Sequence, residues 1–193
     1  MEVTPAAGGG VSLALALVAS ATAGGWAAAV GLPSLGLLAA AELGVRLERL
    51  ALVPRPGERW AAVAAALLDG VDLLLLGLPG RVRAADARRL AARARERGVV
   101  LVALAADERS PAPAWPEPPD LRLSVSGAEW GGLGVGHGRL RSRRLEVIAS
   151  GRRAASRPRC CTLWLPGPGS VTPAPADVAA AGTGVGAATS LAG

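Results

Sequence analysis

The sequence predicts an α/β fold: a mostly parallel sheet flanked by helices, with an antiparallel hairpin appended near the C-terminus. Long and short apolar segments alternate over residues 12–104, and the short ones lack the polar positions of a half-exposed strand. Strands of a parallel sheet are buried on both faces and read as continuous apolar runs. Two later segments instead alternate apolar and polar side chains, which is typical of an antiparallel pair with one solvated face.

The predicted elements follow one another in a repeated strand and helix order. Helices are expected at Ser12–Ala23, Leu35–Leu43, Glu58–Asp69 and Ala84–Arg97. Strands are expected at Trp26–Val30, Arg49–Val53, Val71–Leu78 and Val99–Leu104. Gly44, Gly70 and Gly98 stand where three of the helices should stop. This order favours right-handed crossovers between parallel strands.

The pattern changes at residue 107. Residues 107–120 contain five prolines and several acids, which indicates a loop. Leu121–Ser126 and Leu140–Ala149 then alternate and are joined by a Gly-rich connection over 127–138, so a hairpin is expected at about 121–150. We predict one domain over residues 1–156 and a disordered Pro/Ala/Gly-rich tail over 157–193. Within that tail, Leu163, Trp164 and Leu165 could form a short docking motif.

Composition excludes several classes of chemistry. All 21 basic residues are arginine, so no mechanism can use a lysine ammonium. Cys160 and Cys161 are neighbours and lack metal-site spacing, so we expect no metal and a reducing, cytoplasmic setting. The uncharged stretch between Glu2 and Glu42 is interrupted by Gly and Pro, which favours a buried helix and strand over a membrane span or signal peptide.

Positive charge concentrates in one segment. Residues 139–159 carry eight arginines against one acid, Glu146. Six of these arginines are the candidate binding residues: Arg139, Arg141, Arg143, Arg144, Arg152 and Arg153. They could bind nucleic-acid phosphates, bind an acidic surface of a partner protein, or only keep an edge strand hydrated.

Two local patterns imitate catalytic motifs. Gly8–Gly10 precede a helix, where a phosphate-binding loop would lie, but the lysine that the motif needs is replaced by Val11 and only Ser12 matches. We therefore interpret the glycines as a plain turn. His137, the only histidine, lies among glycines with no nucleophile or orienting partner suggested, so we expect a solvated loop residue.

Residues 42–50 (ELGVRLERL), followed by 71–76 (VDLLLL), resemble the RecA recombinase core, and the resemblance extends over about residues 8–150. It places the phosphate-loop lysine at Val11, the water-activating glutamate at about Leu32, the Walker B aspartate at Gly77 and the γ-phosphate-sensing glutamine near Ala106. None of these replacements can perform the chemistry of its counterpart. The resemblance therefore implies a protein that is not an enzyme and uses no nucleotide cofactor.

The degenerate RecA-like core, the Arg-rich hairpin and residues 163–168 (LWLPGP) together resemble the ImuA-prime family of actinobacterial accessory proteins. This resemblance implies a non-catalytic role in damage-induced, error-prone translesion synthesis. The expected partners are the polymerase-like ImuB and, through it, an error-prone replicative-type DNA polymerase, with a weak DNA contact at the nucleoid. The alternative is a RecA-related nucleic-acid-binding or cell-division regulatory protein of the SOS response.

Overall fold

The computed structural model describes residues 1–4, 9–78, 80–104, 115–133, 138–152, 155–166 and 172–173. The helices are α1 (Gly10–Gly24), α2 (Leu37–Glu42), α3 (Trp60–Leu67) and α4 (Ala84–Arg97), with 3₁₀ turns η1 (Leu47–Arg49) and η2 (Gly57–Arg59). The strands are β1 (Glu2–Thr4), β2 (Ala27–Val30), β3 (Leu50–Val53), β4 (Leu73–Gly77), β5 (Val100–Leu104), β6 (Leu121–Leu133), β7 (Gly138–Gly151), β8 (Arg159–Trp164) and β9 (Thr172–Pro173). Each helix and strand predicted before residue 105 is confirmed, with bounds that differ by a few residues.

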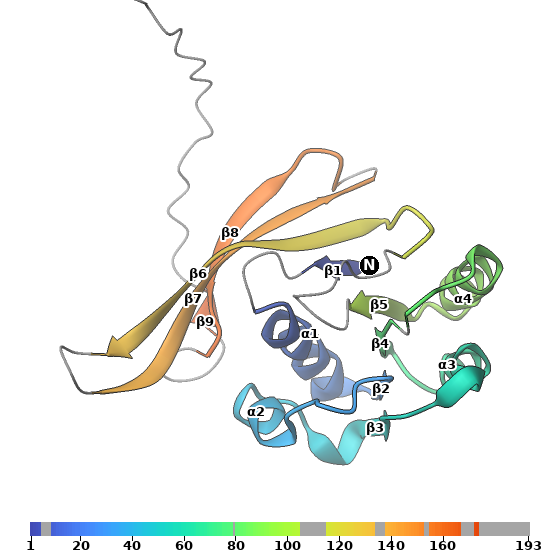
Figure 1. Ribbon diagram of the computed structural model, residues 1–193, viewed down its shortest axis with the longest axis horizontal. Helices are drawn as coiled ribbons and strands as arrows, with labels where there is room; N and C mark the ends of the chain where they lie inside the picture. The colour runs from blue at the N-terminus through green and yellow to red at the C-terminus, as the bar shows by residue number, and fades with distance from the viewer. Residues whose placement is uncertain are drawn as a thin grey trace, which may run out of the picture.

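The strands of the described chain form one nine-stranded sheet in the order β3-β2-β4-β5-β1-β6-β7-β8-β9 (Figure 1). Neighbouring strands from β3 to β6 in this order are parallel. Strands β6 to β9 pair antiparallel, as the predicted hairpin requires. The fold is therefore α/β with a mostly parallel sheet and an antiparallel extension.

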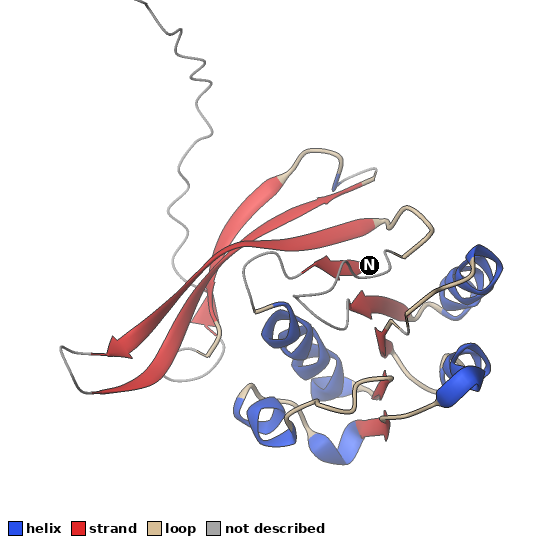
Figure 2. Ribbon diagram, in the orientation of Figure 1, coloured by secondary structure: helices blue, strands red, loops and turns tan. Residues whose placement is uncertain are grey.

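Helices cover both faces of the parallel part of the sheet, with α1 and α2 on one face and α3 and α4 on the other (Figure 2). Strand β4 shows why the sheet needs a layer of helices on each face. Leu73 and Leu75 pack in the core under α1, whereas Leu74 and Leu76 pack in the core under α3 and α4. Because successive strand side chains point to opposite faces, an all-apolar strand must be covered twice.

The hairpin has about its predicted extent, 121–150, but its two strands are longer than predicted. The Gly-rich segment 127–138 was expected to be a connection, but β6 and β7 remain paired as far as Leu133 and Gly138. Register shifts interrupt the pairing at Val125/Gly127 and again near its end. Glycine backbones still form the ladder, and glycine often marks such irregularities in strands. The distal half of the hairpin consequently projects past the helices (Figure 1).

The predicted disordered tail from residue 157 is wrong over its first part. Residues 159–164 form β8, which pairs antiparallel with β7, and Leu165 directly after it is fully buried in the core under α1. This short strand was not predicted because the segment as a whole has low charge and many prolines, which is typical of a disordered tail. Strand β1 was missed for a related reason, because three residues show no periodicity.

Replacing Leu165 with alanine should therefore destabilise the whole domain. Removing a fully buried leucine side chain costs about 2–5 kcal/mol, measurable as a lower urea midpoint of unfolding. Leu140→Ala is the matched control, because Leu140 is 51% exposed on the hairpin. Equal midpoints for the two variants would contradict the placement of Leu165 in the core.

Candidate functional site

Three positions that the RecA resemblance singled out lie at the carboxyl edge of the parallel strands. Val11 is in the first turn of α1, Leu32 follows β2, and Gly77 is the last residue of β4. This edge is where open α/β sheets ordinarily bind ligands. The fourth position, Ala106, lies outside the described residues, as do Gly8, His137 and most of the 107–120 loop.

The end of β4 is sterically closed. A Cβ atom on Gly77 would lie 2.5 Å from the carbonyl oxygen of Gly31 and 2.6 Å from Cδ2 of Leu32. Gly31, with φ +74°, cannot carry a side chain either, because its own Cβ would lie 2.8 Å from the Gly77 carbonyl oxygen. Leu32 therefore fills the space that a carboxylate at position 77 would need. The described residues also contain no cluster of three metal-ligating side chains.

The start of α1 is covered by strand β7. Gly9 caps the helix in the left-handed region, φ 104°, and a Cβ there would lie 2.9 Å from a methyl carbon of Leu145. Arg143 donates from Nη2 to the Ser12 hydroxyl and from Nε to the Leu165 carbonyl at 3.2 Å. Its guanidinium lies 4.8 Å from the centre of the Trp130 ring. Ser12, the one match to the phosphate-loop motif, is thus held by a hairpin arginine.

The structure separates the arginines that the sequence grouped. Arg143 faces α1, where it contacts Ser12. Strand alternation sends Arg144 to the opposite face of β7, where it pairs with Glu129 at 3.7 Å. Arg152 follows β7, about 26 Å along an extended chain from Arg144. The candidates whose side chains the structure describes therefore do not form one basic patch.

The side chains of two of those candidates lie outside the described part of the structure. Arg139 belongs to β7 by its backbone, but its side chain is outside the described part, and Arg153 lies outside it altogether. Arg141 is exposed and forms no ion pair with any described carboxylate. Arg152 is likewise exposed and forms no ion pair with a described carboxylate.

The tail docking motif is wrong in its predicted form. Leu165 is fully buried, and Leu163 and Trp164 are half-buried members of β8. The nearby cysteines offer no metal or nucleophilic site either. Cys160 and Cys161 are successive strand residues and point to opposite faces, and burial raises the pKa of the Cys161 thiol.

Sequence reasoning missed several exposed apolar side chains on α1, α2 and β6. Leu38 is 75% exposed, Trp130 47%, Val11 45% and Leu37 40%. A helix was expected over Leu35–Leu43 without any indication of which side chains it would bury, and within α2 Ala40 alone is buried. An apolar six-residue helix gives no sequence signal of which side chains remain uncovered. Clusters of such residues commonly mark interaction sites.

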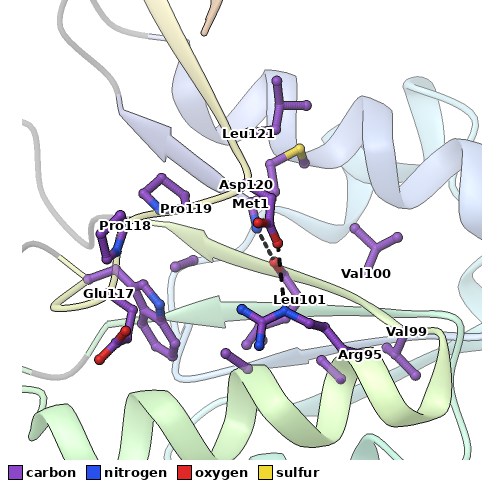
Figure 3. A pocket seen from close by; sticks show the side chains of 14 residues that line it. Met1, Arg95, Val99, Val100, Leu101, Glu117, Pro118, Pro119, Asp120 and Leu121 are labelled. Carbon is purple, nitrogen blue, oxygen red and sulfur yellow. Dashed lines mark hydrogen bonds and ion pairs between the residues drawn. The ribbon is translucent and has the colours of Figure 1, made fainter. Parts of the chain in front are cut away.

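A separate cavity of about 300 Å³ is lined by the amino end of β5 (Figure 3). Gly77 pairs with Leu104 at the other end of this strand. The walls of the cavity are mostly apolar. Its acids are paired, Asp120 with Arg95 and Glu117 with Arg88, each at 3.8 Å. The described lining presents no nucleophile beside a base.

Adding a Walker-type carboxylate should not rebuild a nucleotide site. Gly77→Asp should destabilise the fold by about 1–3 kcal/mol through overpacking against Leu32, and Val11→Lys/Gly77→Asp should still fail to bind MgATP by calorimetry. Gly80→Ala is the control, because nothing lies within 4 Å of its added Cβ. Wild-type stability together with MgATP binding in the double variant would contradict the steric argument.

No helix among the described residues is long and apolar enough to cross a membrane.

Known proteins match the part of the chain that forms strands β1 to β5. The chain is 55% identical over 96 residues to the uncharacterized protein Rv3395c of Mycobacterium tuberculosis, a match that covers 49% of this chain and 47% of the relative. The chain thus matches about half the length of that relative. A family model described as the MT3502 N-terminal domain matches residues 2–116, strands β1 to β5 with their helices, and the chain belongs to that family.

Proposed function

We propose that this protein is a non-catalytic accessory protein of damage-induced translesion DNA synthesis, of the ImuA-prime type, built on a degenerate RecA-like core. One observation carries the proposal. Leu32 fills the space beside Gly77, while the parallel sheet and its helices around this point stay fully packed. In a scaffold whose nucleotide position is closed, the surface is the part that can bind a partner.

The partner in this proposal is the polymerase-like ImuB, and through it an error-prone replicative-type polymerase, in the cytoplasm. Exposed apolar side chains on α1, α2 and the hairpin suit protein binding. The similar protein from Mycobacterium tuberculosis fits the actinobacterial type of the resemblance.

The distribution of arginines gives less support to a protein that acts mainly by binding nucleic acid. Arg143 is engaged by Ser12 and Trp130, and Arg144 pairs with Glu129 on the other face of the hairpin. Binding along a duplex requires several cations on one surface, since each neutralised phosphate contributes separately to affinity. A weak DNA contact through Arg141 is compatible with this arrangement.

Co-purification tests the proposal. The full chain should bind the ImuB-like protein of the same genome at a salt concentration that abolishes its binding to duplex DNA, and it should neither bind nor hydrolyse MgATP. Measurable ATP hydrolysis by the pure protein would refute the non-catalytic role. DNA binding with a steep salt dependence, without ImuB binding, would favour the SOS regulatory alternative.

A further inference from the structure

We propose that the cavity lined by the amino end of β5 binds a free apolar α-amino acid. The side chain of the ligand lies inside the cavity, and its α-ammonium and α-carboxylate groups lie at the mouth. The cavity, here called the β5 cavity, has a volume of about 300 Å³ (Figure 3). This site goes beyond the proposed function, because it binds a small molecule and does not depend on a protein partner.

The walls of the β5 cavity are one continuous, well-packed surface. Ala91 and Ala94 lie one helical turn apart on α4 and line the cavity together with Leu101 and Ala103 of β5. Trp115, at the start of the segment that leads into β6, completes the apolar lining. All of these except Ala91 are buried in the core under α3 and α4. The cavity is therefore formed before any ligand enters, as small-molecule sites usually are.

The size and polarity of the β5 cavity match the side chain of one apolar amino acid. An apolar cavity of about 150 Å³ stays dry and accepts benzene. A cavity of about 300 Å³ therefore has room for a branched aliphatic or aromatic side chain and for the α-carbon that carries it. A polar side chain would lose its water contacts against the described apolar walls and gain no hydrogen bond from them.

Arg95 and Asp120 present opposite charges to the same cavity. Arg95 Nε lies 3.8 Å from Asp120 Oδ2, which is too long for a hydrogen bond, and the two side chains are 66% and 69% exposed. The guanidinium can therefore still donate to a ligand, and the carboxylate can still accept. An α-amino acid zwitterion carries the matching pair, a carboxylate for Arg95 and an ammonium for Asp120. A ligand with one charge would leave one of the two unmatched.

The other charged groups of the described lining are engaged elsewhere. The Met1 amine donates to the Leu101 carbonyl at 2.8 Å, and burial lowers the pKa of this amine. Glu117 pairs with Arg88, which lies on α4 outside the lining. Figure 3 shows the Arg95 side chain close to Asp120, between Glu117 on one side and Val99 on the other. Arg95 and Asp120 thus form a pair with no net charge, which suits a zwitterion with no net charge.

Calorimetric titration of the full chain with leucine, phenylalanine and two leucine analogues tests the proposal. The analogue 3-methylbutylamine lacks the carboxylate, and 4-methylpentanoate lacks the ammonium. Leucine or phenylalanine should bind. Each analogue should bind at least about tenfold more weakly than leucine, because a site that hydrogen-bonds a ligand group discriminates against a ligand without it. Serine, which has no apolar side chain, should not bind.

Variants locate the binding in the β5 cavity. Arg95→Gln and Asp120→Asn should each weaken amino-acid binding at least about tenfold, and Ala91→Leu should abolish it by filling the cavity. The matched controls are Arg144→Gln and Glu129→Gln, a pair at 3.7 Å on the hairpin, and Ala92→Leu, on the exposed side of α4. These three should bind as wild type does. Arg95 and Asp120 are exposed, so their variants remain informative even if Ala91→Leu lowers the melting temperature.

The results separate this proposal from the proposed function. If wild type binds neither leucine nor phenylalanine, the amino-acid site is wrong and the accessory role is unaffected. Equal affinity for leucine and 4-methylpentanoate, or wild-type affinity in both Arg95→Gln and Asp120→Asn, would overturn recognition of the zwitterion. Wild-type affinity in a folded Ala91→Leu variant would overturn the β5 cavity as the site.

Discussion

Gly31 and Gly77 approach each other so closely across β2 and β4 that neither position accepts a side chain, and Leu32 closes the space above them. This approach follows from the parallel register of the two strands, in which Val30 pairs with Leu76. It sets what the carboxyl edge can do, because a metal-binding carboxylate cannot be placed there without moving Leu32. The space at this point is filled by packing.

The hairpin reinforces the same arrangement. Leu145 packs on Gly9 and Arg143 bridges Ser12, Trp130 and the Leu165 carbonyl, so β7 holds the start of α1 against the sheet. A guanidinium suits this role because it donates in several directions and stacks on an aromatic ring. An ammonium group would offer a single point charge. Arginine therefore suits position 143 better than lysine would.

Much of the fold could be predicted from the sequence, because its parallel strands are continuous apolar runs and its longer helices end at glycines. Helix α4 was predicted with its observed bounds. Strands β1 and β8 could not be predicted, since one is too short for periodicity and the other lies in a segment of tail-like composition. Three of the site positions were named from the resemblance, but their steric closure depends on a contact between β2 and β4 that sequence does not show. The grouping of Arg143 with Arg144 failed because neighbours along a strand face opposite sides. The exposure of Leu37 and Leu38 depends on what α2 packs against, which composition does not reveal.

Hydrogen exchange at the start of α1 tests most directly whether this chain binds a protein partner in place of a nucleotide. Amides of residues 10–18 of the full chain would be followed alone, with MgATP, and with the ImuB-like protein. The account predicts slower exchange with the protein partner and no change with MgATP. Slower exchange with MgATP and none with the partner would contradict it.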